Sequence, residues 1–234
     1  MTAIVELKYG FCLSINFQWR EKMSSLHIVD HPLTGDCLRI LRSRQTGTRD
    51  FRSAMDKLSL VLAVEAAKDL KYSKENVITP LDTGADCLRV QDDRVLLVPI
   101  LRAGLGFLNS FLQLLPEAKV AHIGVSRDHD TLEACPYCNS VPESNDGFDT
   151  IFVLDPMLAT GNSSVKALEM IIEKGYRPGQ ITLVCAVSVK KGISQVHSRY
   201  PEVKIITAAV DPGLNEKAYI VPGLGDAGDR LYLL

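Results

Sequence analysis

The sequence predicts an α/β protein whose parallel sheet is flanked by helices on both faces. Short apolar runs alternate with segments of helical period from residue 95 to about residue 210, and that alternation is typical of a covered parallel sheet. The apolar runs have the length of strands, far below the ~20 residues that a membrane helix needs. The 234 residues also match the size of one α/β domain. We therefore expect a single domain over residues 26–234.

The N-terminal part of the chain contains one strong helical pattern. Residues 1–25 show no clear period, and we treat them as an extension of unassigned role. From Phe51 to Leu70, apolar residues recur at a spacing near 3.6. This spacing predicts a long amphipathic helix, with Thr48 or Asp50 as its cap.

The stretch from residue 95 to residue 125 predicts a βαβ unit. Val95–Leu101 is continuously apolar and predicts a buried strand. Gly104–Leu115 has the pattern of a helix, which Pro116 stops. Val120–Val125 is again strand-like.

The second half of the chain continues the alternation. In order, we expect a strand at Thr150–Leu154, a helix to about Lys174 that Gly175 ends, a strand at Ile181–Ser188, a helix at Lys190–Arg199 and a strand at Val203–Ala209. Ligands of such sheets bind beyond the carboxyl ends of the strands. The chemistry is therefore expected in the segments that follow Leu101, Val125, Leu154 and Ala209.

The charge and the N-terminus exclude several classes of protein. Lys and Arg number 26 against 28 Asp and Glu, and this formal charge of −2 provides no bulk attraction to nucleic acid or to an anionic membrane. Glu6 and Lys8 interrupt the apolar run that a secretory segment needs. We expect a cytoplasmic protein with no membrane span and no nucleic-acid partner.

The six cysteines are dispersed in a chain that is too long to need a disulfide scaffold, so we interpret them as free thiols. Cys135 and Cys138 form a C-x-x-C, but a zinc site would need a second pair at suitable spacing. A half-buried strand or hairpin is expected there, with a redox or metal role as the weaker alternative. The five histidines have no ligand spacing, so neither a metal site nor a catalytic triad is expected.

The most informative segment joins an expected strand to an expected helix. It reads Asp155-Pro156-Met157-Leu158-Ala159-Thr160-Gly161-Asn162-Ser163. Backbone N–H groups converge at the positive end of the helix dipole, and two hydroxyls add donors, so the segment predicts a phosphate-binding turn. Alone, it would be interpreted as an ordinary helix start. The carboxylate of Asp155 at the strand end favours the ligand, because it can accept hydrogen bonds from the hydroxyls of a ribose 5′-phosphate.

This segment resembles the phosphoribosyl-pyrophosphate (PRPP) motif of the type I phosphoribosyltransferases, in the form typical of the uracil phosphoribosyltransferases. Pro99–Gly104 is similar to that family's pyrophosphate loop, and Tyr219–Arg230 is similar to its uracil-binding C-terminal loop. His31–Leu33 and Phe51-Arg52 also fit the family. The resemblance covers residues 27 to 232 in order, and it implies the type I fold with a C-terminal base-binding hood.

The resemblance also implies ligand contacts for individual residues. The PRPP site would consist of Arg102, Ala103, Gly104, Arg127, Asp155, Pro156, Met157, Leu158, Ala159, Thr160, Gly161, Asn162, Ser163 and Asp226. Uracil would be bound by Tyr219, Ile220, Gly225, Asp226 and Ala227. The catalytic residues would be Asp155, Arg102 and Asp226. A metal site made by the protein alone is not expected, since Mg²⁺ would enter with PRPP.

The activity implied is the Mg²⁺-dependent transfer of ribose 5-phosphate from PRPP to N1 of uracil, which gives UMP and pyrophosphate in pyrimidine salvage. Arg102 fits this activity, because an arginine fork satisfies diphosphate oxygens better than a lysine does. Small residues at positions 103 and 104 would let backbone N–H groups approach the same oxygens. Arg127 has an alternative, which is pairing with Asp128 or Asp130 beside it. The acceptor of the uracil N1 proton is not identified.

Two departures from the family pattern bear on these expectations. Asn162 stands where many relatives have a second glycine, and we expect asparagine to tolerate an unusual φ there. Cys135–Val141 has less bulk and more cysteines than is common in the family, which bears on contacts between subunits. A homodimer or homotetramer is expected.

A basic cluster precedes and enters the first predicted helix. It consists of Arg39, Arg42, Arg44, Arg49 and Arg52, with Asp50 as the one acid among them. A solvated helix face or a salt-bridged dimer surface is the favoured interpretation. A site for a GTP effector is the alternative, because some family members are activated by GTP.

Two rival functions come from other classes. A nucleotide-sensing regulator of the same fold that binds RNA would need a basic face, and the near-neutral charge argues against one. A dinucleotide-binding oxidoreductase could use Gly104–Asn109, but the third glycine of that fingerprint is missing.

Overall fold

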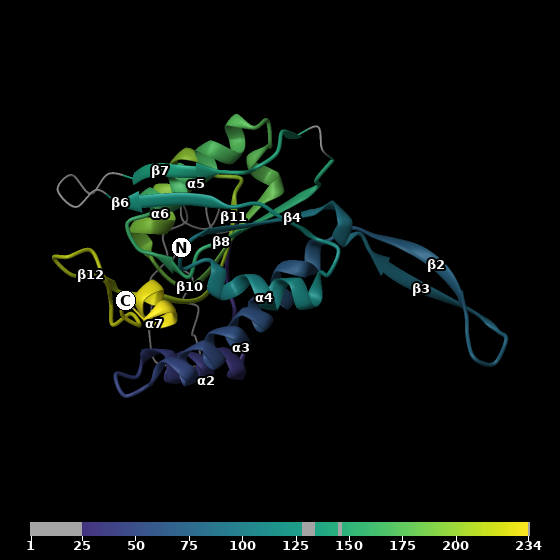
Figure 1. Cartoon of the computed structure of the whole chain (residues 1–234), viewed down its shortest axis with the longest axis horizontal. Coiled ribbons are helices and arrows are strands. Elements are labelled where there is room, and N and C mark those ends of the chain that lie inside the picture. Colours follow the sequence, from purple (N-terminus) through teal and green to yellow (C-terminus); the bar gives the residue numbers. More distant parts are fainter. Residues whose placement is uncertain (1–24, 128–133, 145–146, 234) are drawn as a thin grey trace, which may run out of the picture.

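The protein folds around one large sheet, seen in a computed structural model that describes residues 25–127, 134–144 and 147–233 (Figure 1). The expected extension at residues 1–25 lies outside these ranges, apart from Ser25. The strands follow the order β1-β11-β10-β8-β4-β6-β7, with β5 beside β4 and β9 beside β10. Every pair is parallel except β6 with β7. The predicted α/β fold with a parallel sheet is confirmed.

The sheet strands are β1 (Leu26–Ile28), β4 (Val95–Leu101), β5 (Lys119–Val120), β6 (Ile123–Arg127), β7 (Ala134–Asn139), β8 (Thr150–Leu154), β9 (Met157–Leu158), β10 (Ile181–Val189) and β11 (Lys204–Asp211). The helices are α2 (Pro32–Arg42), α3 (Thr48–Ala66), α4 (Leu105–Leu114), α5 (Asn162–Glu173), α6 (Lys190–Arg199) and α7 (Ala227–Tyr232).

Strand β8 shows why the central strands are unbroken apolar runs. Phe152 and Leu154 belong to the apolar cluster under α2, α3, α4 and α7. Ile151 and Val153 belong to the cluster under α5 and α6. Successive side chains of a strand point to opposite faces, so a strand covered on both faces needs an apolar residue at every position. Figure 1 shows α2, α3 and α4 together on one side of the sheet.

The element bounds agree with the sequence at β4, β8 and α6, and those of α4, β10 and β11 differ from it by one or two residues. The strand expected at Val120–Val125 is divided into β5 and β6, because the N–H of His122 donates to Ser140 Oγ instead of to a neighbouring strand. Helix α3 is found at Thr48–Ala66 instead of Phe51–Leu70, and neither Thr48 nor Asp50 caps it. Its N-cap is Gly47, which makes no side-chain hydrogen bond.

The residues of the C-x-x-C lie on β7, which pairs antiparallel with β6. Cys135 is exposed and Cys138 is half-buried, so the expected strand is found. Within the described part of the chain, no group of three or more metal-ligating side chains comes together. No helix of the described residues is long and apolar enough to cross a membrane.

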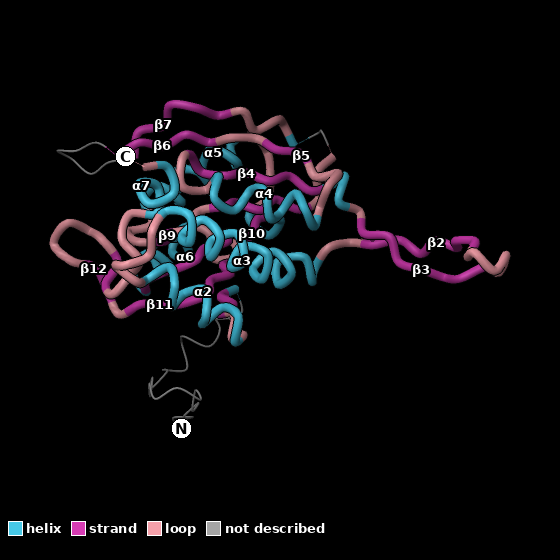
Figure 2. The backbone as a smooth tube through the Cα atoms, turned by 60° about the horizontal axis from the view of Figure 1, so that its bottom comes forward, coloured by secondary structure: helices cyan, strands magenta, loops and turns pink. Residues whose placement is uncertain are grey.

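An antiparallel hairpin of β2 (Tyr72–Ile78) and β3 (Gly84–Val90) projects from the body of the molecule (Figures 1 and 2). No strand was predicted from the sequence at these residues.

Candidate active site

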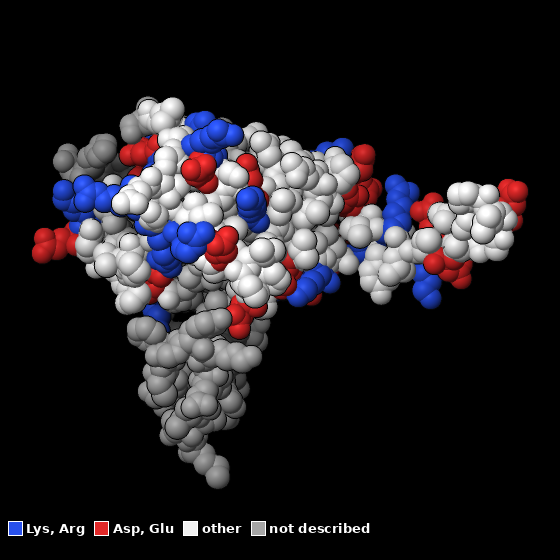
Figure 3. Space-filling view, turned by 90° about the horizontal axis from the view of Figure 1, so that it is seen from below, with Lys and Arg blue, Asp and Glu red and all other residues white. Residues whose placement is uncertain are grey.

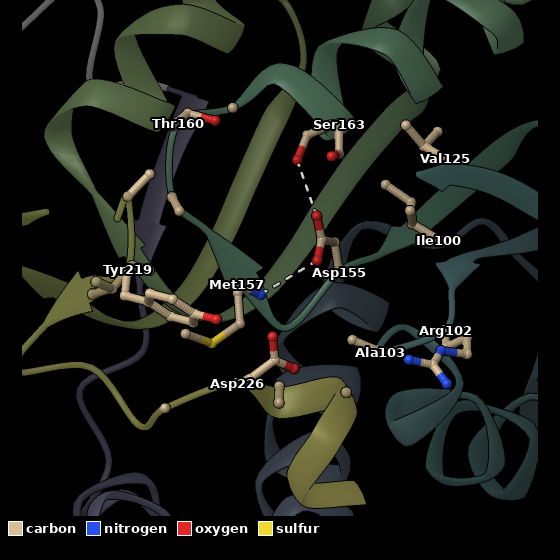
Figure 4. A pocket seen from close by; sticks show the side chains of 18 of the residues that line it. Ile100, Arg102, Ala103, Val125, Asp155, Met157, Thr160, Ser163, Tyr219 and Asp226 are labelled. Atoms are coloured by element: carbon tan, nitrogen blue, oxygen red, sulfur yellow. Dashed lines mark hydrogen bonds between the residues drawn. The ribbon is translucent and has the colours of Figure 1, made fainter. Parts of the chain in front are cut away.

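A cavity of about 500 Å³ opens at the carboxyl edge of the sheet. Its walls come from the loops after β4 and β8, the first turn of α5, the segment before and within β13 (Ile220–Val221), and the start of α7 (Figure 4). Val125 of β6 also lines it. Segments that are far apart in the sequence therefore meet where the topology of a parallel sheet places a ligand.

One wall is formed by residues 155–163, which we call the phosphate turn. Gly161 is the N-cap of α5 and has φ of +87°, a conformation that side chains other than glycine rarely adopt. Thr160, Gly161 and Ser163 line the cavity, so the positive end of the α5 dipole faces it. The residue with an unusual φ is thus Gly161. Asn162 is the first residue of the helix and has no positive φ, so the tolerance of asparagine for an unusual backbone conformation is not needed there.

Asp155 stands at the end of β8 and points into the cavity (Figure 4). Its backbone N–H donates to Val184 of the neighbouring β10 at 3.1 Å. Its carboxylate accepts hydrogen bonds from the N–H of Met157 at 3.3 Å and from Ser164 Oγ at 3.1 Å. These contacts fix the carboxylate on the strand side of the phosphate turn.

The loop after β4 forms the opposite wall, where Arg102 and Ala103 line the cavity. Gly104 does not line it, and its N–H already donates to the carbonyl of Ile100 at 2.9 Å. The expectation that Gly104 offers its N–H to a ligand is therefore corrected. Glycine is needed for space, because a Cβ would lie 2.2 Å from the carbonyl oxygen of Leu154.

The third wall is residues 219–226, which we call the base loop. Its residues Ile220 and Val221 pair antiparallel with β12 (Gly213–Leu214). The loop then turns at Gly223 and Gly225, with φ of +58° and +82°. Asp226 closes the loop as the N-cap of α7, where its carboxylate accepts from the N–H of Asp229 at 2.9 Å. In Figure 4 this carboxylate faces the cavity from the start of α7.

Most of the expected site residues line this cavity, namely Arg102, Ala103, Asp155, Met157, Ala159, Thr160, Gly161, Ser163, Tyr219, Ile220, Gly225, Asp226 and Ala227. Pro156, Leu158 and Asn162 belong to the phosphate turn but do not line the cavity, and Pro156 and Leu158 are buried. Arg127 ends β6, and its side chain lies outside the described part of the structure.

Sequence reasoning missed Ser164, Lys217 and Ala218, which also line the cavity. Ser164 is buried and donates to Asp155, and its place in the first turn of α5 is the signal that could have identified it. Lys217 is exposed, in the segment after β11 where ligand contacts were expected.

Behind the loop after β4, burial raises the pKa of the Tyr232 hydroxyl, and the charges of Arg52 and Arg102 oppose that shift. Burial also raises the pKa of Asp56 on α3.

The basic cluster does not form one free patch. Arg39 pairs with Asp36 on the surface of α2, and Arg42 pairs with Asp211 at the end of β11. Arg52 donates to the carbonyl of Leu231 at 2.7 Å. Arg44 and Arg49 are exposed. The favoured interpretation as a solvated face holds for Arg39, Arg44 and Arg49, whereas Arg42 and Arg52 are engaged within the chain; a salt-bridged dimer surface stays a prediction.

A phosphate turn that follows a parallel strand, with a carboxylate at the strand end and a base loop across the cavity, is the arrangement of the type I phosphoribosyltransferases. The profile described as "Uracil phosphoribosyltransferase" matches residues 28–233. The chain belongs to the uracil phosphoribosyltransferase family.

Individual proteins of this family are similar to the chain over nearly its whole length. The uracil phosphoribosyltransferase of Agrobacterium fabrum is 44% identical over 90% of this chain and 99% of its own length. That of Thermosipho africanus is also 44% identical, over 88% of this chain and 98% of its own. Among solved structures, the AQ2163 protein from Aquifex aeolicus has a TM-score of 0.81 at 34% identity, over 89% of this chain and 98% of that one.

Gly104→Ala should destabilise the protein, because its Cβ would overlap backbone atoms of both β4 and β8. Overpacking of this kind costs roughly 1–3 kcal/mol. Gly35→Ala is the matched control, since a Cβ there meets nothing within 4 Å and alanine favours the interior of α2. Denaturant unfolding should show a loss for position 104 and none for position 35. Equal free energies of unfolding for the two variants would contradict the geometry of the loop.

Proposed function

We propose that the cavity binds PRPP and uracil together and that its residues transfer the 5-phosphoribosyl group to N1 of uracil, with release of pyrophosphate. The observation that carries this proposal is that the phosphate turn, the loop after β4 and the base loop open into one cavity. A donor sugar phosphate and an acceptor base held there would face each other. Such positioning supplies much of the rate of a two-substrate reaction.

The phosphate turn binds the 5′-phosphate of PRPP in this proposal. The backbone N–H groups of residues 160–163 and the hydroxyls of Thr160 and Ser163 are the donors. Asp155 accepts hydrogen bonds from the ribose hydroxyls. Arg102, Ala103 and Arg127 bind the diphosphate, and the guanidinium fork of Arg102 matches two phosphate oxygens.

Backbone groups of Ile220 and Gly225 in the base loop, and of Ala227 at the start of α7, bind uracil. Uracil presents two carbonyl acceptors and one N3–H donor on a flat ring, so backbone donors and acceptors can recognise its edge without a charged side chain. Tyr219 lines the cavity beside this edge. Asp226 lies at the junction between the base loop and α7, where it contributes to both halves of the site.

The residues of the cavity fit a Mg²⁺ ion that arrives with PRPP. Asp155 and Asp226 are carboxylates that line it, and Mg²⁺ is usually bound by one or two carboxylates together with substrate phosphates and waters. When bound, the ion supplies charge neutralisation to the diphosphate. A site made by the protein alone is not part of the proposal.

Breaking the bond from C1′ to the diphosphate develops positive charge on the ribose and negative charge on the leaving group. Arg102 stabilises the leaving group, and Asp155 holds the ribose while the charge develops. A strong general base is not required, because the positive charge that develops on N1 as the new bond forms makes its proton acidic enough to pass to water or to the departing pyrophosphate.

The alternative of an RNA-binding regulator has no support in the structure. On the face seen in Figure 3, Lys and Arg alternate with Asp and Glu, and no continuous basic surface appears among the described residues drawn. The basic cluster is largely engaged in contacts within the chain. A GTP effector stays a prediction for its exposed members, Arg44 and Arg49, and an assay with and without GTP tests it.

The five described cysteines are free, which supports a reducing, cytoplasmic location for the protein. Burial raises the pKa of Cys37 and of Cys185, so these two thiols are held in the unreactive form.

We further propose that the β2–β3 hairpin is the contact through which two copies associate. Its register places Tyr72 opposite Val90 and Lys74 opposite Leu88, so Tyr72, Ile78, Leu88 and Val90 share one face. Ile78 is 70% exposed and Leu88 is 64% exposed. The same face also carries Lys74 and the hydrogen-bonded pair of Asn76 and Asp86, so it is mixed in character. An isolated two-stranded hairpin is marginally stable in water, and a second copy would cover its exposed apolar side chains.

Uracil and 5-fluorouracil should both react with PRPP, whereas cytosine should be rejected by ~10⁴ or more. The amino group and the unprotonated N3 of cytosine reverse the hydrogen-bonding pattern and leave buried backbone groups unpaired. Competition among uracil, 5-fluorouracil, cytosine, orotate and hypoxanthine measures this. A preference for orotate or hypoxanthine over uracil would reject the proposed function.

Asp155→Asn should lower turnover by ~10² or more, because the ribose is no longer held by a carboxylate. Asparagine has the same size and keeps one oxygen to accept from Met157 or Ser164, so the fold should persist. Asp50→Asn, at an exposed position on α3, is the control and should react at the rate of the parent. Steady-state kinetics with saturating PRPP provides the comparison. Turnover of Asp155→Asn within a factor of two of the parent would contradict a role of Asp155 in binding the ribose.

Ile78→Lys should weaken self-association by replacing the most exposed of the four apolar side chains on this face of the hairpin with a charge. Val77→Lys, on the opposite face and 40% exposed, is the matched control. Sedimentation equilibrium should give a dimer or tetramer of the 25.7 kDa chain for the parent and for Val77→Lys, and a smaller species for Ile78→Lys. A monomeric parent, or the same mass for both variants, would contradict this interface.

A further inference from the structure

The base loop has little regular structure of its own to hold it in place. Its ladder with β12 consists of two residue pairs, Gly213 with Val221 and Leu214 with Ile220. Beyond Val221 the chain leaves the ladder and turns through Gly223 before α7 begins at Ala227. The position of the backbone groups that face uracil must therefore depend on other contacts.

Those contacts come from an ion pair outside the cavity. Arg42, in the last turn of α2, donates to both carboxylate oxygens of Asp211, at 2.7 and 2.8 Å. Arg42 Nη1 also donates to the carbonyl of Gly223 at 2.9 Å. Asp211 Oδ2 accepts from the N–H of Gly223 at 2.8 Å. Both backbone polar groups of Gly223 are thus bound by one ion pair.

The pair is shielded from water. The side chain of Asp211 is 6% exposed and that of Arg42 is 25% exposed. Bidentate pairing of this kind fixes direction as well as distance, because the planar guanidinium matches the two carboxylate oxygens. Gly223 is therefore held at one position and in one orientation.

The constraint on Gly223 reaches the cavity through Ile220. A Cβ on Gly223 would lie 2.1 Å from the carbonyl oxygen of Ile220, so the two backbones are in direct contact. Ile220 lines the cavity, whereas neither Arg42 nor Asp211 is among the described residues that line it. The ion pair is thus connected to the cavity through the backbone contact between Gly223 and Ile220.

A second guanidinium supports the same loop from α7. Arg230 donates to the carbonyl of Leu224 at 2.8 Å and to that of Ser43 at 3.0 Å. It also donates to the carbonyl of Leu41, and it lies over the ring of Phe51. The base loop is thereby joined to the C-terminal end of α2, from which Arg42 projects.

We propose that Arg42 and Asp211 are positioning residues for base recognition, which hold the base loop around Gly223 in the conformation that binds uracil. PRPP binding is left to the rest of the cavity and to Asp226, whose carboxylate is held separately as the N-cap of α7 by the N–H of Asp229. This inference rests on the proposed function for its kinetic consequence. Its structural consequence, an ordered base loop, does not depend on any activity.

Arg42→Lys tests the proposal, because lysine keeps the charge but loses the fork that spans Asp211 and Gly223. The KM for uracil should rise by roughly 10- to 100-fold, the range expected for a small displacement of a positioned group, while the KM for PRPP stays near the parent value. Arg39→Lys is the matched control, since Arg39 lies on the same helix and pairs with Asp36 at the surface. It should leave both constants unchanged.

Amide hydrogen exchange of residues 219–226 gives a readout that needs no substrate. Exchange there should be faster in Arg42→Lys than in the parent and in Arg39→Lys, with the phosphate turn unchanged. If Arg42→Lys does not fold, Asp211→Asn replaces it, because asparagine keeps an acceptor for the N–H of Gly223 and loses the ion pair.

The outcomes separate this inference from the proposed function. A parent that forms no UMP rejects the proposed function, and the exchange measurement still decides the role of the pair. Equal loss of affinity for uracil and PRPP, or base-loop exchange that matches the control, overturns the inference.

Discussion

The site depends on the parallel register of β4, β8 and β10, which brings the ends of these strands to one edge of the sheet. The N–H of Asp155 continues the ladder of β8 onto Val184, so the carboxylate is fixed by the sheet itself. The loop after β4 passes so close to Leu154 that Gly104 cannot carry a side chain. The phosphate turn and the loop opposite it are therefore held at a fixed separation by backbone contacts.

A chain with a formal charge of −2 has no bulk attraction for an anion, so any positive potential must be local. The start of α5, Arg102 and Lys217 bring positive charge to the cavity, and the carboxylates of Asp155 and Asp226 line it as well. Other arginines serve the structure instead. Arg42 and Arg230 satisfy backbone carbonyls of the base loop, and the cost of burying them is offset by several hydrogen bonds each.

Local patterns predicted much of the fold and of the site. Neighbouring residues determine the apolar runs of β4 and β8 and the phosphate turn. These features could therefore be predicted from the local sequence. Contacts between distant residues could not be read in this way. Arg42 and Asp211 are 169 positions apart, so the local sequence predicted a solvated helix face or a salt-bridged dimer surface for the basic cluster, with an effector site as the alternative, and it could not show that Arg42 pairs within the chain. The division between β5 and β6 likewise depends on Ser140, in a later segment.

In the proposed function, one cavity holds the sugar phosphate at the phosphate turn and the base at the base loop. A crystal structure with UMP and pyrophosphate bound would decide this. We expect the 5′-phosphate at the N–H groups of residues 160–163, the ribose hydroxyls at Asp155, and the uracil edge at the backbone of Ile220, Gly225 and Ala227. A nucleotide bound with its base at the phosphate turn, or outside this cavity, would contradict it.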